Sequence, residues 1–97
     1  SDEFGAQSAF ILIQDSFDRG DFNAVQSGTF AFSEKGGDQQ YWMARSFILL
    51  GDSYAASGRR AQAKATYESI RDGYTPTSDA DDILETVKTR LEQLERK

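Results

Sequence analysis

An internal repeat constrains this chain more than any other feature of its sequence. Residues 10–17 (FILIQDSF) align with residues 47–54 (FILLGDSY), and each block leads into a turn that ends at a glycine, Gly20 or Gly58. The offset is 37 residues through the blocks and 38 at the glycines, so one loop is expected to be a residue longer. A second helical stretch follows each glycine. The simplest interpretation is two helical hairpins in tandem.

Apolar residues recur at the three- and four-residue spacing of an α-helix. Phe10, Ile13 and Phe17 share one helical face, and the second block repeats that spacing. No stretch shows the alternation that is typical of a strand, so the sequence predicts an all-α fold. Asp79 is the predicted N-cap of the last helix. The predicted helices cover residues 5–18, 22–34, 39–56, 60–72 and 79–95.

The second hairpin carries an ordered set of small and aromatic residues. In chain order these are Phe47-x2-Leu50-Gly51-x2-Tyr54, Ala63-x3-Tyr67 and Pro76. This order resembles the tetratricopeptide repeat, whose pattern is Trp-x2-Leu-Gly-x2-Tyr, Ala-x3-Phe and Pro at a period near 34 residues. The resemblance implies a right-handed α-solenoid of two hairpins with a C-terminal capping helix. Small side chains at Gly51 and Ala63 are expected to let the two helices approach closely.

The first hairpin resembles the same pattern less closely. Gln14 stands where glycine is usual and Thr29 where an aromatic residue is usual, and Phe30 and Phe32 are expected to supply the missing bulk. The resemblance still implies a single domain made of repeat one (5–36), repeat two (39–76) and a capping helix (79–97).

In tetratricopeptide arrays the first helices line a concave groove, and the resemblance implies which side chains face it here. These are Ser8, Ile11, Asp15 and Asp18 on the first helix, and Arg45, Ile48, Asp52 and Ala55 on the third. Asp15 and Asp52 are expected to lie side by side, which predicts a mildly acidic groove for a peptide or protein with basic groups. The alternative interpretation is that both aspartates are solvated charges on an exposed face.

Composition limits the chemistry that such a groove can perform. The 97 residues include 11 basic and 16 acidic side chains, no histidine and no cysteine, for a net charge of −5. The missing residue types exclude Ser-His and Cys-His dyads and the usual zinc ligands. The negative charge disfavours nucleic acid and anionic lipid as partners, and the longest apolar run, residues 47–50, is too short to span a membrane. We therefore expect no enzyme activity and no cofactor.

The function that the resemblance implies is a non-catalytic protein–protein interaction scaffold. An architectural alternative stays open, in which the module extends a longer solenoid or forms a weak homodimer through its terminal helices. Leu84, Val87, Leu91 and Leu94 form a two-heptad seam that favours capping of the chain's own repeat over pairing with a second chain. The chain begins without a methionine, so we expect a fragment of a longer repeat protein. Its second repeat is similar to those of bacterial multi-repeat proteins, which favours the cell envelope over the cytoplasm.

Overall fold

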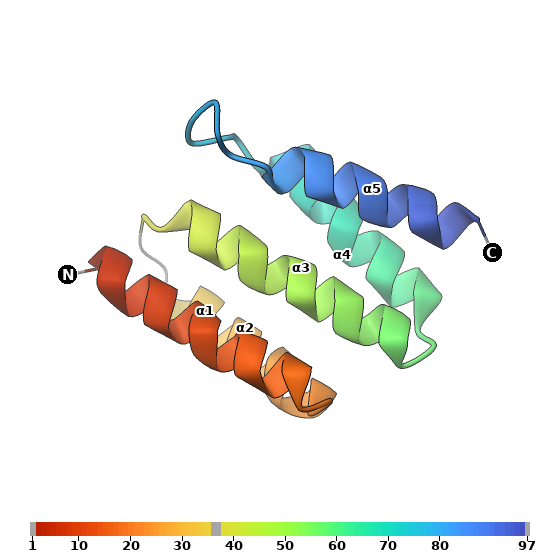
Figure 1. Cartoon of the computed structure of the whole chain (residues 1–97), viewed down its shortest axis with the longest axis horizontal. Coiled ribbons are helices and arrows are strands. Elements are labelled where there is room, and N and C mark those ends of the chain that lie inside the picture. The colour runs from red at the N-terminus through yellow and green to blue at the C-terminus, as the bar shows by residue number, and fades with distance from the viewer. Residues whose placement is uncertain (1, 36–37, 97) are drawn as a thin grey trace.

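The computed structural model describes residues 2–35 and 38–96, which form five α-helices and contain no strand. The helices are α1 (Asp2–Asp18), α2 (Phe22–Lys35), α3 (Gln40–Ala56), α4 (Arg60–Gly73) and α5 (Ile83–Glu95). The predicted all-α class is therefore confirmed. Figure 1 shows α1, α3 and α5 towards the viewer, with α2 and α4 behind them. The central helix, α3, contacts each of the other four.

The first four helices repeat with a period of 38 residues. Adding 38 to the first and last residue numbers of α1 and α2 gives those of α3 and α4. The turn after α1 and the turn after α3 are consequently equal in length. The prediction that one loop is a residue longer is wrong, because the 38-residue period already holds inside the helices.

The two turns also close in the same way. Gly20 and Gly58 have φ angles of 76° and 79°, in the left-handed region that glycine adopts without strain. The N–H of the residue after each glycine donates to the carbonyl five residues earlier, at 2.9 Å from Asp21 to Ser16 in the first turn and at 2.8 Å in the second. These bonds satisfy carbonyl groups that the end of a helix leaves unpaired.

Burial follows the 38-residue period and not the 37-residue offset of the sequence blocks. Residues that are 38 apart are buried in both hairpins: Ala6/Ala44, Phe10/Ile48, Ile13/Gly51, Val25/Ala63, Thr29/Tyr67 and Phe32/Ile70. A shift of one residue turns a helical position by about 100° around the axis. The similar blocks at residues 10–17 and 47–54 therefore place matching letters on different faces of α1 and α3.

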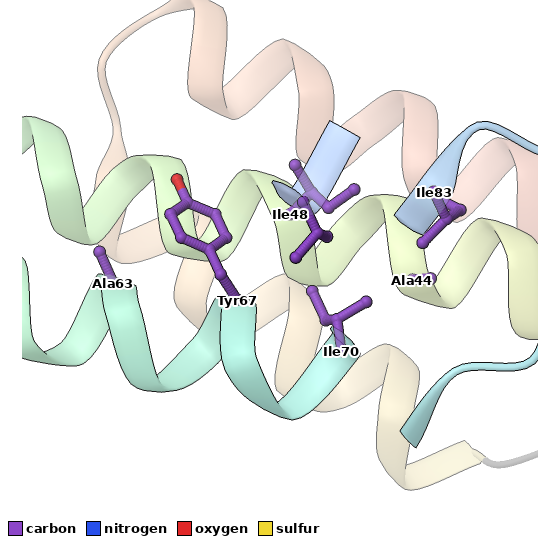
Figure 2. Close-up of a cluster of buried hydrophobic side chains, with 7 residues drawn as sticks. Ala44, Ile48, Ala63, Tyr67, Ile70 and Ile83 are labelled. Atoms are coloured by element: carbon purple, nitrogen blue, oxygen red, sulfur yellow. The ribbon is translucent and has the colours of Figure 1, made fainter. Parts of the chain in front are cut away.

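The closest approach in the second hairpin is between Gly51 and Tyr67. A Cβ atom at position 51 would lie 2.5 Å from Cε1 of Tyr67, whose side chain is 1% exposed. Ala63 is fully buried one turn before Tyr67. Figure 2 shows the side chains of Tyr67 and Ile70 rising from α4 towards α3, which carries Ile48 of the same cluster. The small residues at 51 and 63 do lie in the helix contact, and Tyr67 fills the space that Gly51 leaves.

The first hairpin exchanges the large and small sides of this contact. Ile13 occupies the place equivalent to Gly51, and a Cβ atom at Gly28 would lie 3.1 Å from Cγ1 of Ile13. The bulk is thus on the first helix and the gap on the second. The expectation that Phe30 supplies bulk is wrong, since its side chain is 42% exposed, whereas Phe32 is buried as expected.

The last helix begins at Ile83, so the predicted start and N-cap at Asp79 are wrong. Asp81 holds the preceding segment in a turn. Its Oδ1 accepts the N–H of Ile83 at 2.9 Å, and its Oδ2 accepts the N–H and hydroxyl of Thr77, at 2.9 and 3.0 Å, and the hydroxyl of Tyr74. A carboxylate that binds the local backbone in this way competes with helix formation.

The apolar side of α5 packs on the second hairpin. Ile83 and Val87 are buried in one cluster with residues of α3 and α4, and Leu91 and Leu94 pack against that cluster. Three of the four seam residues, Val87, Leu91 and Leu94, therefore pack on the chain's own second hairpin. No helix in the described part of the chain is long and apolar enough to cross a membrane.

We predict that Gly51→Ala destabilises the fold, because the added methyl group would overlap the buried ring of Tyr67. Overpacking of this kind lowers the free energy of unfolding by about 1–3 kcal/mol. Gly5→Ala is the matched control: its Cβ meets nothing within 4 Å in the described part of the chain, so higher helix propensity should add about 0.5–1 kcal/mol. Urea denaturation measures both, and equal changes would contradict the proposed contact.

We also predict an acid-sensitive contribution from Asp81. Burial alone raises the pKa of its carboxyl, but the hydrogen bonds from Tyr74, Thr77 and Ile83 lower the pKa by more, for a net decrease. Because the folded pKa is depressed, the stabilisation is present above the usual pKa of 3.8 and is lost as pH falls through the folded value.

Asp81→Asn should therefore lower the free energy of unfolding at pH 7 by on the order of 1 kcal/mol. The difference in the free energy of unfolding between Asp81→Asn and the parent chain should become smaller below about pH 4. Thermal unfolding across this pH range measures the effect, with exposed Asp79→Asn as the control. A difference between Asp81→Asn and the parent that does not change with pH would refute the prediction.

Candidate functional site

A cleft of about 270 Å³ lies over α3, between α1 and α5. These are the three helices on the near side of the molecule in Figure 1. The lining residues are Phe10, Gln14 and Phe17 of α1, Arg45, Ile48, Leu49 and Asp52 of α3, and Asp82, Ile83, Thr86 and Arg90 at α5. Aromatic, aliphatic and charged side chains thus meet in one concave surface.

Arg45 lies on an aromatic shelf in this cleft. Its guanidinium carbon is 4.5 Å from the ring centroid of Phe10, 5.4 Å from that of Trp42 and 5.8 Å from that of Tyr41. The rings support one another, with centroids 5.5 Å apart for Phe10 and Trp42 and 5.2 Å apart for Tyr41 and Trp42. A cation over an aromatic face is attracted by the ring quadrupole, so the shelf fixes where the positive charge sits.

Asp52 joins three helices at the other end of the cleft. Its Oδ1 accepts the hydroxyl of Tyr67 on α4 and Nε of Arg90 on α5, the latter at 2.8 Å, and its Oδ2 accepts Nη2 of Arg90 at 3.1 Å. The Asp52 side chain is only 13% exposed. It is therefore not the solvated charge that the alternative interpretation of the sequence expected.

The titration behaviour of this cluster indicates a structural role. Burial raises the pKa of the Tyr67 hydroxyl far above its usual value, and the hydrogen bond to Asp52 raises it further. The hydrogen bond to Asp52 also raises the pKa of the Arg90 guanidinium. Near neutral pH Tyr67 stays protonated and Arg90 stays charged, and their hydrogen bonds to Asp52 link α3, α4 and α5.

The cleft contains three of the eight residues that the sequence placed in the groove. Arg45, Ile48 and Asp52 line the cleft, although Ile48 is also part of the buried core. Ala55 lies next to it, in a neighbouring hollow of about 580 Å³ that shares Asp52 and Arg90.

The four residues predicted on the first helix lie outside the cleft. These are Ser8, Ile11, Asp15 and Asp18. Asp15 pairs with Arg19 at 2.5 Å on the exposed surface, and Asp18 accepts a hydrogen bond from Gln14 at 3.1 Å. The expectation that Asp15 lies beside Asp52 is wrong, because the residue equivalent to Asp52 in the 38-residue period is Gln14.

Sequence reasoning missed the aromatic wall of α1 and the contribution of α5. Phe10 and Gln14 are the 38-residue equivalents of Ile48 and Asp52, and all four line the cleft. The offset between Gly20 and Gly58 carried this information, but the similarity of the two eight-residue blocks outweighed it. Nothing in the sequence pattern pointed to Arg90, which reaches the site through the packing of α5.

The described residues hold no group of three or more acidic side chains arranged for a metal ion. Comparison of the chain with protein-family models, curated proteins and solved structures finds no match. A function for this chain therefore has to be inferred from the cleft and from the faces of the helices.

We predict that Arg90→Met destabilises the chain by about 1–3 kcal/mol, because Asp52 would keep a buried charge with Tyr67 as its remaining partner. Arg19→Met is the matched control. Its pair with Asp15 is 58% exposed on both sides, so the loss should stay below about 0.5 kcal/mol. Urea denaturation gives the two free energies, and amide hydrogen exchange should show faster opening of α5 in Arg90→Met alone. Equal losses in the two variants would argue against the three-helix link.

Proposed function

We propose that this chain is a non-catalytic protein–protein interaction scaffold of the tetratricopeptide type, and that its cleft binds a segment of another polypeptide. The observation that carries this proposal is the position of Arg45 on its aromatic shelf within the cleft. A guanidinium that lies over a ring contacts it mainly through its face. Its N–H donors lie in the guanidinium plane, so contact with a ring does not use them and an acceptor on a bound segment can take them.

The walls of the cleft indicate what the bound segment contains. Phe17 is half-buried and offers apolar surface for an aliphatic or aromatic side chain, while Phe10 and Ile48, each 6% exposed, lie beneath the cleft. Arg45 beside them favours a carboxylate or a carbonyl group. The preference for basic groups expected from the sequence loses its support, because Asp15 and Asp52 each pair with an arginine.

A right-handed solenoid of two repeats and a capping helix belongs to the same proposal. It is supported by the 38-residue period and by the way in which α5 continues it. Adding 38 to Gln14 gives Asp52, and adding 38 again gives Arg90, and all three residues line the cleft. The helix α5 thus stands where the first helix of a third repeat would stand.

The test is to select peptides on the parent chain from a displayed random library and to measure their affinities by calorimetry. Arg45→Glu should weaken them by about tenfold to a hundredfold, as expected for loss of a charge-assisted hydrogen bond. Arg45→Lys should weaken them less, because it keeps the charge but not the planar donors. Asp15→Lys is the control, since this residue lies outside the cleft.

Two results would count against the proposal. One is a library that yields no binder to the folded chain. The other is a set of binders whose affinity falls with Asp15→Lys as much as with Arg45→Glu. Asp52→Lys is unsuitable for this test, because it would remove the link to Tyr67 and Arg90 and so change stability and binding together.

A second candidate function is architectural, with the module stacked against another helical unit. The observation in its favour is the exposure of large apolar side chains on α1, away from the cleft: Phe4, Ile11 and Leu12. The α5 seam gives no such support to a homodimer, since it packs on the second hairpin.

A further inference from the structure

The outer edge of the first hairpin exposes side chains whose repeat equivalents are covered. Phe4, Ile11 and Leu12 of α1 are 74%, 54% and 69% exposed. Residues 38 further along are Trp42, Leu49 and Leu50, of which Trp42 is half-buried while Leu49 and Leu50 are 8% and 2% exposed. The same positions are therefore interior in one hairpin and exposed in the other.

The first hairpin covers two of these positions on α3, Trp42 and Leu49. Leu49 is buried in one cluster with Val25 and Phe32 of α2, and Trp42 packs against that cluster. The Thr29 hydroxyl, fully buried, donates to the carbonyl of Ser46 at 3.5 Å. The buried side of α2 thus presents an aliphatic residue, a small hydroxyl and an aromatic residue at i, i+4 and i+7.

A groove on the first hairpin adjoins these exposed side chains. It has a volume of about 530 Å³, runs along α1 and α2 and is lined largely by small residues. They are Gly5, Ala9 and Ser16 of α1 and Ala24, Gly28 and Ala31 of α2. Leu12 stands in the same groove, so a packed helix would bury it together with the small residues.

We propose that this surface, the α1–α2 edge, binds an amphipathic helix that carries the buried pattern of α2. The argument is continuity: the edge repeats, one period earlier, the surface of α3 that α2 covers. A second copy stacked head to tail does not fit, because the opposite end of the array presents Glu85, Lys88 and Glu92 exposed on α5. This proposal concerns a different face from the cleft and stands independently of it.

The experiment adds one structural period to the intact chain. An extra copy of residues 2–39 is joined directly before Asp2, which places a second α2 sequence one period ahead of α1. We expect the extended chain to unfold in a single transition, at a higher urea midpoint and with a steeper denaturant dependence than the parent. Both changes follow from the additional surface that is buried when the edge is covered.

A pair of substitutions locates the effect at the edge. Ile11→Ser with Leu12→Ser should barely move the midpoint of the parent chain, where both side chains are exposed. The same pair in the original copy of the extended chain should lower the midpoint clearly. Placed in the added copy, at the new open edge, the pair should again have little effect, which makes it a matched control.

Several results would overturn the proposal. They are two separate unfolding transitions, a midpoint that does not rise, and a pair of substitutions with the same effect in both copies. A parent chain that forms dimers in sedimentation experiments, and loses them with Ile11→Ser and Leu12→Ser, would assign the edge to a second copy instead. If the extended chain does not fold, hydrogen exchange of the parent with a synthetic peptide of residues 21–35 decides: protection of α1 amides supports the proposal, and unchanged exchange refutes it.

Discussion

The contact between Gly51 and Tyr67 determines how Asp52 and Arg90 meet at one end of the cleft. Because position 51 has no side chain, the Tyr67 ring can cross α3 and bring its hydroxyl to the neighbouring carboxylate of Asp52. Asp52 in turn holds Arg90, and Arg90 places α5 beside α3. The lack of a side chain at Gly51 thus permits the contacts of Tyr67 with Asp52 and of Asp52 with Arg90, which connect three helices at the wall of the cleft.

Strong local signals allowed most of the fold to be predicted from the sequence. Glycines at 20 and 58 mark turns that require a left-handed backbone, and α2, α3 and α4 begin and end within a residue of their predicted limits. The start of the last helix could not be predicted in the same way. Asp79, Asp81 and Asp82 are all plausible caps by residue type. Only the folded chain shows that Asp81 binds Thr77 and Tyr74 and keeps the segment out of the helix.

The candidate site was harder to predict because it depends on helical phase. Two alignments of the hairpins, at 37 and 38 residues, differ by a single position, yet they select different faces of α1. Sequence identity favoured the 37-residue alignment, which pairs Asp15 with Asp52. Side-chain packing follows the 38-residue alignment, in which Gln14 is the equivalent of Asp52 and lines the cleft. In the first hairpin the large residue of the contact, Ile13, is on the first helix and the glycine, Gly28, is on the second. The glycine that the motif places on the first helix is therefore missing, so the motif did not reveal the 38-residue alignment. The contacts of α5 with the cleft could not be predicted from the repeat pattern, because α5 follows the two repeats.

The shared period also determines which changes of length this architecture tolerates. Loss of one residue inside α3 would rotate the following part of that helix by about 100° and carry Asp52 away from its partners on α4 and α5. Gain or loss of a complete hairpin would leave every face in phase. Evolution of chain length by whole units is therefore compatible with the packing, whereas insertion or deletion of a single residue inside a helix is not.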